Sequence, residues 1–229
     1  MLLVKIHFIM RYLFLLVFFI FMVLLGTYIL RPKSKDELPL KVLNPNDINP
    51  ELVDSLLQGV GHGHKIQEFS LINQYGEKIT QKTVQGKVYV VDYFFTTCGS
   101  ICPIMTGQMK RVQAAYLSND DFLILSHTVW PEVDTVEQML RYAKEKAVVK
   151  GKWHLLTGNK EHLYDLARKS YFVLKPAEAE DVGDGNSDFI HTNNFVLVDK
   201  QRRIRGYYDG TDSTEVSKLI KDIDLLLRE

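Results

Sequence analysis

The sequence has almost no cysteine and no excess of either charge. Its 229 residues include only two cysteines, and 28 basic side chains balance 28 acidic ones. Nothing in this balance indicates the basic face that a nucleic-acid-binding protein needs, so we expect no nucleic-acid partner. Internal repeats and low-complexity runs are also missing, which argues against a repeat architecture. What stands out is the position of the two cysteines, because both fall within the segment FFTTCGSICPIM at 94–105.

A charge-free apolar run lies near the N-terminus. Residues 12–30 read YLFLLVFFIFMVLLGTYIL, a length that suits the roughly 20 residues needed to cross a bilayer as a helix. A cleaved signal peptide or a buried helix gives a similar pattern, but no small-residue cleavage site lies near Gly26. We therefore predict a retained single-pass anchor at 12–30 after a short N-terminal segment at 1–11. Basic residues flank the run on both sides, so the positive-inside rule does not decide the topology.

The stretch after the apolar run, residues 31–63, carries four prolines and little apolar periodicity. This composition predicts a tether that ends by packing on the edge of a domain. The tether runs into GHGH at 61–64, where two histidines at alternate positions could share a metal ion. The simpler interpretation of GHGH is the end of a flexible linker.

The remainder of the chain, residues 64–229, alternates β-branched or aromatic runs with amphipathic ones. Strand–helix–strand segments are followed by two adjacent strands and a last helix, which is the βαβ–ββα order of an α/β thioredoxin-like fold. We expect a hairpin at 69–80, strands at 87–95, 122–129, 153–158, 194–199 and 204–210, and helices after Cys102 and at 135–147, 159–170 and 213–227. Asp134 or Thr135 should cap the helix at 135–147, and Asn159 the helix that it begins.

Two polar residues interrupt the predicted buried strands. Asp92 lies in the first of them, and a carboxyl group there should be paired or at a sheet edge. His127 lies near the end of the second, where it either supports the thiol site or faces solvent. Both interpretations of His127 stay open at this point.

The cysteines occupy a strand–helix corner. Cys98 follows a predicted strand, and Cys102 opens a helix one turn later. Functional residues of open α/β sheets collect at the carboxyl ends of strands, and the positive end of a helix favours a thiolate. A structural disulfide is the alternative, but closing so short a loop stabilises by only roughly 2–3 kcal/mol. We therefore predict thiols that react or bind, and Cys98–Cys102 is a candidate redox-active disulfide.

Two thiolates on one face suit a soft cation, above all Cu(I). His191, in SDFIHTNNFVLVD, stands just before the strand expected beside the Cys98 strand, so it is the candidate third ligand. The acidic segment at 177–188 leads into His191, and we expect a mobile loop that carries the histidine in and out. Met105 and Met109 are soft thioethers near the site, but their helical spacing indicates core packing.

FFTTCGSICPIM together with DFIHTNNFVLVD resembles the SCO/SenC family, membrane-anchored thioredoxin-like proteins that deliver copper to cytochrome c oxidase. The resemblance covers about Gly61 to the C-terminus. It implies Cys98, Cys102 and His191 as ligands of Cu(I) and also Cu(II), without catalysis of a reaction. It further implies a domain on the periplasmic side of the inner membrane, a copper-accepting oxidase subunit as partner, and an upstream copper donor or thiol reductant.

The sequence departs from the family pattern in two places. VWPEVDT at 129–135 stands where the family usually has an Asp-Pro-Glu-Arg-Asp-Thr-like segment, so Trp130 and Val133 replace an aspartate and an arginine. Gly99 stands where the family often has proline. The missing aspartate puts in doubt a role in tuning the site or in contact with a partner. Gly99 bears on the redox behaviour of the cysteines and need not impair metal binding.

Two other functions use a similar fold. A thiol–disulfide oxidoreductase would act on cysteines of an oxidase subunit or another periplasmic protein, but thioredoxins use C-x2-C, and here the spacing is C-x3-C. A thiol peroxidase would need an activating threonine and arginine. Thr96 and Thr97 are present, but the sequence identifies no such arginine.

Overall fold

The structure, a computed structural model, describes residues 2–29, 39–174 and 192–229. They form two units, Met1–Pro39 and Leu40–Glu229, each considered separately. Among its described residues, the first unit contains one helix, α1 (Leu2–Ile29). Within it, Met10–Tyr28 is long and apolar enough to cross a membrane, and the large apolar side chains of this stretch are exposed.

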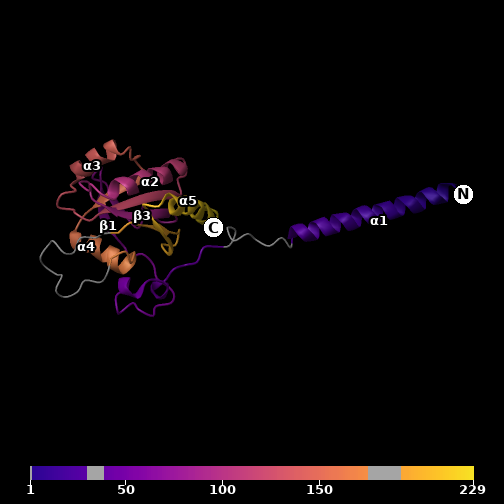
Figure 1. Cartoon of the computed structure of the whole chain (residues 1–229), viewed down its shortest axis with the longest axis horizontal. Helices are drawn as coiled ribbons and strands as arrows, with labels where there is room; N and C mark the ends of the chain where they lie inside the picture. Colours follow the sequence, from indigo (N-terminus) through magenta and orange to yellow (C-terminus); the bar gives the residue numbers. More distant parts are fainter. Residues whose placement is uncertain (1, 30–38, 175–191) are drawn as a thin grey trace. The chain divides into compact units, whose positions relative to one another are not determined.

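A seven-stranded mixed sheet in the order β2-β1-β5-β4-β3-β6-β7 organises the second unit (Figure 1). β3, β4 and β5 are parallel neighbours, whereas β6 runs antiparallel to β3. This arrangement confirms the predicted thioredoxin-like α/β fold and the pairing of the two strands nearest the cysteines and His191. The strands are β1 (Ser70–Asn73), β2 (Lys78–Thr80), β3 (Val88–Phe94), β4 (Phe122–Thr128), β5 (Trp153–Thr157), β6 (Asn194–Val198) and β7 (Ile204–Asp209).

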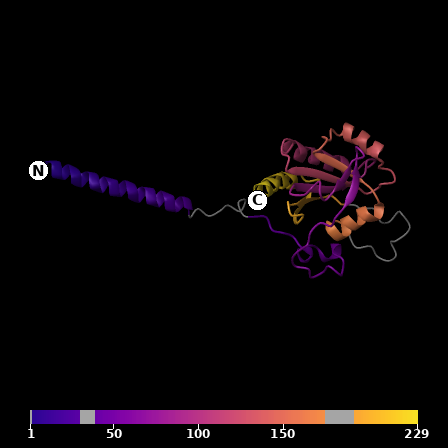
Figure 2. The same ribbon diagram turned by 180° about the vertical axis from the view of Figure 1, so that it is seen from behind.

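Helices cover both faces of the sheet (Figures 1 and 2). On one face lie α2 (Cys102–Ala115), α3 (Val136–Glu145) and α5 (Ser213–Arg228); on the other lie α4 (Lys160–Asp165) and the π-helical turn η4 (Leu166–Ser170). Thr135 caps α3 and Asn159 caps α4, since each side chain accepts a backbone N–H of the first turn. Both were among the predicted caps.

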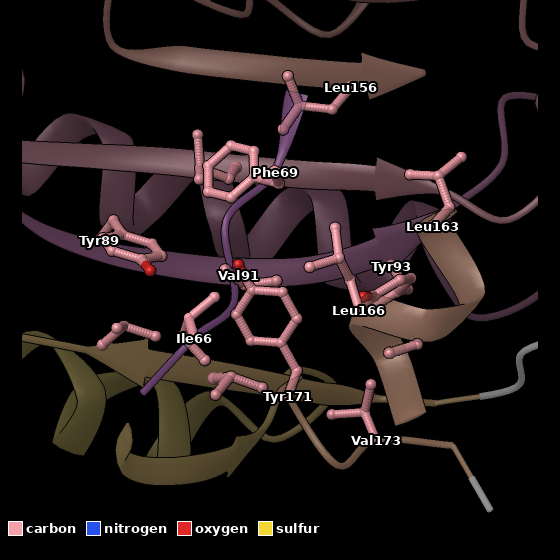
Figure 3. Packing of buried hydrophobic residues seen from close by; sticks show 14 of the residues in the cluster. Ile66, Phe69, Tyr89, Val91, Tyr93, Leu156, Leu163, Leu166, Tyr171 and Val173 are labelled. Atoms are coloured by element: carbon pink, nitrogen blue, oxygen red, sulfur yellow. The ribbon is translucent and has the colours of Figure 1, made fainter. Parts of the chain in front are cut away.

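Alternation along β3 divides the core into two layers. Tyr89, Val91 and Tyr93 face the layer beneath α4 and η4, where Ile66 and Tyr171 pack with them (Figure 3). The intervening residues of β3 face α2 and α5. Every residue of β3 is buried. The central strand therefore has no solvent face, which accounts for its nearly continuous run of β-branched and aromatic residues.

Part of the stretch predicted as a tether packs within the second unit. The turns η2 (Pro45–Asp47) and η3 (Pro50–Leu52) precede a buried Val53, and the Leu43 N–H donates to the carbonyl of Ile204 at 2.8 Å. These contacts join the stretch to β7 at the sheet edge. The boundary between tether and domain at 63/64 stays a prediction.

The segment 159–170 is not one regular α-helix as predicted. α4 ends at Asp165, and the chain widens into η4, where the Tyr171 N–H donates to the Leu166 carbonyl at 2.8 Å. Leu166 and Tyr171 are both fully buried. The wider turn places both side chains in the core. Local helix propensity could not predict this turn, because it depends on tertiary packing.

Asp92 lies in the middle of the sheet, because β4 and β6 flank β3. The Ser126 hydroxyl donates to its carboxyl group, and Trp153 Nε1 donates to Ser126 Oγ at 2.7 Å. Asp92 is therefore paired through a hydrogen bond, which confirms the prediction that it would be paired or at a sheet edge. Burial raises the pKa of Asp92 to about 7, and the bond from Ser126 offsets this only in part.

His127 is fully buried, so the interpretation that it faces solvent is wrong. Its ring packs against Tyr93 at 5.2 Å and Tyr171 at 5.6 Å between centroids. Neither ring nitrogen has a hydrogen-bond partner in the described part of the chain. Burial lowers the pKa of His127 to about 3. Like β3, β4 is buried on both faces, so its alternation offers no solvent side to a polar residue.

These two buried groups should change stability with pH in opposite directions. Between about pH 4 and 7, the folded Asp92 carboxyl group is protonated and the unfolded one ionised, so its stabilising contribution grows as pH falls. Between about pH 3 and 6.5, folded His127 is neutral and unfolded His127 protonated, so its contribution is lost as pH falls. The two effects oppose each other in the wild-type protein.

We expect Asp92→Asn to make the slope of unfolding free energy against pH more positive, and His127→Leu to make it more negative. Each change should approach about 1.4 kcal/mol per pH unit between about pH 4.5 and 6.5. Urea unfolding followed by tryptophan fluorescence measures these slopes, with exposed Glu161→Gln as the control. Identical slopes in all four proteins would contradict the prediction.

Candidate metal centre

The two cysteines lie between the C-terminal end of β3 and the start of α2. Cys98 is half-buried in the connecting loop, where its N–H donates to the Phe95 carbonyl at 3.2 Å. Cys102 is the first residue of α2 and is buried. Pro103 fits the first turn of α2, because an N–H at that position would have no intrahelical acceptor. Both cysteines are free thiols.

One cavity of about 150 Å³ joins the two thiols. Its walls come from the end of β3, the cysteine loop, the first turn of α2, the segment after β4, and Thr192, which precedes β6. Apart from sulfur and a few hydroxyl groups, these walls are apolar and include Phe94, Phe95, Ile101 and Val129. A small cation that enters therefore meets the sulfur atoms as its main ligands.

Different surroundings give the two thiols opposite acidities. Partial burial opposes ionisation of Cys98, but hydrogen bonds from the Cys102 thiol, the Ser100 hydroxyl and the N–H groups of both residues lower its pKa to about 7. Burial raises the pKa of Cys102 to about 12, and its hydrogen bond to Cys98 raises it further. At neutral pH, Cys98 is therefore about half thiolate, whereas Cys102 stays protonated.

Asp134 ties the cysteine loop to the end of β4. Its fully buried carboxylate accepts hydrogen bonds from the Thr96 N–H at 3.1 Å, the Thr96 hydroxyl at 2.5 Å and the Thr128 hydroxyl. Gln138 of α3 donates to the same Thr96 hydroxyl at 3.1 Å. Because Thr96 stands two residues before Cys98, these bonds fix the loop that presents the first thiol.

The sequence pattern marks Asp134 only as a candidate helix cap, and the structure gives that role to Thr135. Thr96 lies in the loop after β3, whereas Thr128 ends β4 and Asp134 lies in the loop that follows β4. The two loops meet because Phe94 pairs with Thr128 at the ends of the two strands. The available signal was the presence of polar residues directly after two neighbouring parallel strands, which share one sheet edge.

Trp130 forms an aromatic rim beside the thiols. Its ring meets Phe95 in a T-shaped contact at 6.4 Å between centroids, and Phe95 lines the cavity. Trp130 is 38% exposed, and Ile101 and Ile104 near the start of α2 are also exposed. The rim is therefore apolar at a position where the family resemblance implies a carboxylate.

The third predicted ligand, His191, lies outside the described residues, as does the acidic segment 177–188. Its chain neighbour Thr192 is buried and lines the same cavity as Cys98 and Cys102. Among the residues that the structure describes, no three His, Cys, Asp or Glu side chains gather closely enough to hold a metal ion. The ligand set of Cys98, Cys102 and His191 remains a proposal.

The GHGH run contributes to packing. His64 is half-buried, its Nε2 shares a hydrogen bond with the Ser170 carbonyl at 2.9 Å, and its ring lies 4.7 Å from that of Phe172. Burial lowers the pKa of His64. His62 is exposed. One of the two imidazoles is therefore already engaged with η4, which weakens the interpretation of GHGH as a shared metal site.

A family model described as SCO1/SenC matches residues 58–228, and the chain belongs to this family. The SCO1 protein homolog of Bacillus subtilis (strain 168) is 29% identical to it over 163 residues, which cover 70% of this chain and 81% of the relative.

Solved structures resemble the second unit. ScoI of Arabidopsis thaliana with copper bound is 25% identical, with a TM-score of 0.53 over 69% of this chain and 97% of that one. BsSco, described as a member of the Sco family of cytochrome c oxidase assembly proteins with a disulfide switch, has a TM-score of 0.62. BsSco is 24% identical to this chain, and the match covers 82% of this chain and 98% of BsSco. At this identity it supports the fold alone.

The unequal thiols predict selective alkylation. We expect iodoacetamide to modify Cys98 first, at a rate that rises about tenfold per pH unit below its pKa and levels off above about pH 8. Cys102 should stay unmodified over the same range. Peptide mapping of the reduced protein measures both rates. Ser100→Ala removes one hydrogen bond to Cys98 and should move the midpoint of its rate–pH profile to higher pH. Equal alkylation rates at the two cysteines would contradict the assignment of unequal acidities.

Replacing Asp134 should loosen the cysteine loop. We expect Asp134→Ala to lower the unfolding free energy by about 2–4 kcal/mol, because one buried and two part-buried donors lose their acceptor. Hydrogen exchange of the Thr96 N–H should accelerate before global unfolding. Glu132→Gln, an exposed change two residues away, is the control. Unchanged exchange at Thr96 would show that Asp134 does not hold the loop.

Proposed function

We propose that this SCO1/SenC family member is a membrane-anchored copper metallochaperone that delivers copper for assembly of a cytochrome c oxidase copper centre. Cys98, Cys102 and His191 would bind Cu(I), and Cu(II) in a second state. The observation that carries the proposal is the shared cavity, which is lined by both thiols and by Thr192, the chain neighbour of His191. The copper-bound ScoI supports the cargo. Membership of the SCO1/SenC family, whose resemblance implies delivery of copper to cytochrome c oxidase, supports the destination.

The donor set fits the proposed cargo. Two sulfur atoms and an imidazole suit Cu(I), a soft cation that accepts low coordination numbers. Cys98 supplies a thiolate near neutral pH, whereas Cys102 must give up its proton when a metal binds. Loading therefore releases protons and strengthens as pH rises. Unloading is ligand exchange with thiols or imidazoles of a partner, so no covalent bond of a substrate has to break.

The apolar helix α1 supports membrane anchoring. Exposing the apolar side chains of Met10–Tyr28 to water would be energetically costly. The length of this helical stretch matches the thickness of a bilayer. We assign residues 12–30 to the inner membrane, 31–63 to a tether and 64–229 to the periplasm, with 1–11 in the cytoplasm. The anchor would confine the search for an oxidase subunit, and for a copper donor or thiol reductant, to the membrane surface.

A thiol–disulfide oxidoreductase is the second candidate, because the two thiols differ in acidity and exposure. A half-buried Cys98 with a pKa of about 7 suits attack on a disulfide, and a buried Cys102 suits resolution of the mixed disulfide. Copper loading itself requires both thiols to be reduced. Exchange with a reductant therefore fits the chaperone role as a preparatory step.

A Cu(I) titration against a competing chelator tests the proposal. The full chain in detergent, reduced and free of oxygen, should bind one Cu(I), and Cys98→Ala or Cys102→Ala should abolish competitive binding. His191→Ala should weaken binding by about tenfold or more, since it removes one of three ligands. His62→Ala is the matched control, because His62 is an exposed histidine outside the cavity.

The same variants separate the two candidate functions. Copper binding equal in the wild-type protein and the cysteine variants, with wild-type reduction of a disulfide substrate, would replace the chaperone proposal with thiol exchange. Equal effects of His191→Ala and His62→Ala would remove His191 from the ligand set and leave a two-thiol site.

A further inference from the structure

A second cavity, of about 350 Å³, lies at the opposite end of β3 from the thiols. Three segments form it: the approach to β1, the turn after β2, and the turn between β6 and β7. The last of these turns follows Val198, which pairs with Tyr89 at the start of β3. The volume lies within the range of about 300–1,000 Å³ that is typical of small-ligand sites.

Half of the residues that line the cavity are cations. Lys65, Lys82, Lys200 and Arg202 contribute four positive charges, and Glu68 is the one carboxylate among its described lining residues. Lys65, Lys82 and Arg202 form no ion pair with any residue in the described ranges. The remaining walls carry glutamine amides, which can donate further hydrogen bonds to an anion.

The nearest buried carboxylate does not neutralise these cations. Asp199 is 2% exposed and accepts from the Gln201 N–H at 2.9 Å, from Arg203 Nε at 2.8 Å and from Arg205 Nη1 at 3.0 Å. Its acceptor capacity is therefore taken up by the β6–β7 turn and by two arginines outside the cavity. The positive charge of the cavity remains available to a ligand.

Arg202 gives an independent indication of a ligand. Its Nη1 is buried and has no hydrogen-bond partner among the described residues, which is unusual for a permanently charged donor. Its backbone lies in the left-handed region at φ 65°, closed by a bond from its N–H to the Asp199 carbonyl at 2.9 Å. Glycine adopts this conformation at lower cost, yet the position holds a guanidinium group that lines the cavity.

We infer that this cavity is a binding site for a phosphate-bearing anion, held by the Arg202 guanidinium group and by Lys82 and Lys65. Arginine and lysine together provide the forked donors and the point charges that phosphate oxygens accept. The anion is either a free phosphate compound or the headgroup of an anionic lipid, since both present the same chemistry.

The site is independent of the thiols. The seven residues of β3 separate the two cavities by about 20 Å at roughly 3.3 Å per residue. Anion binding should therefore leave Cu(I) affinity unchanged, and the inference does not depend on the proposed chaperone function.

The first test uses calorimetric titration of the full chain in phosphatidylcholine nanodiscs with inorganic phosphate and pyrophosphate. We expect saturable binding that Lys82→Gln/Arg202→Gln weakens by about tenfold or more, since each lost contact is a charge-assisted hydrogen bond. Lys110→Gln, which removes an exposed charge on α2, is the control. Unchanged folding of the double variant is checked by its Cys98 alkylation profile.

A second arm distinguishes the two sources of the anion. Hydrogen exchange of peptides covering 65–68, 81–85 and 200–202 is compared in phosphatidylcholine and phosphatidylglycerol nanodiscs. Protection that appears only with the anionic lipid, and disappears in the double variant, supports a headgroup site. Binding of the free phosphates alone supports a soluble anion. Neither response, or an equal loss in Lys110→Gln, would overturn the inference.

Discussion

The packing of β3 between β4 and β6 is the constraint on which both cavities depend. All seven residues of β3 are buried, so its register cannot shift without moving Asp92 onto the aromatic layer that holds His127. With this register fixed, the C-terminal end of the strand delivers the cysteine loop to α2. Its N-terminal end meets the β6–β7 turn that carries Arg202. Two sites of different chemistry thus share one rigid element.

In the central strands β3 and β4, burial favours the uncharged forms of the ionisable side chains. On one face of the sheet, Asp92 pairs with Ser126 of β4. On the other face, the next residue of β4, His127, packs on Tyr93. Burial favours the uncharged form of both Asp92 and His127. The same tendency extends to Cys102, whose pKa is raised by burial and by its hydrogen bond to Cys98. The thiol site without a metal therefore carries at most about one negative charge near neutral pH, a state compatible with its apolar walls.

Sequence periodicity and capping predicted most of the fold, because they are local properties. The hairpin and the caps of α3 and α4 follow from patterns within a dozen residues. The pairing of β3 with β6 follows from the βαβ–ββα order of the elements. The orientation of His127 could not be predicted, since a strand buried on both faces carries no exposed side. The hydrogen bonds of Asp134 were equally inaccessible, because they join loops that only the parallel pairing of β3 and β4 brings together.

The departures from the expected family segment fall at positions that do not hold the thiol loop. Asp134, which matches the pattern, anchors Thr96, and Thr135, which also matches, caps α3. Trp130, which departs from it, is 38% exposed at the rim. The substitution therefore leaves the support of Cys98 intact and changes the surface that surrounds the cavity. A partner that reaches the thiols meets an aromatic rim there, so this chain offers apolar contact beside the thiols in place of charge pairing.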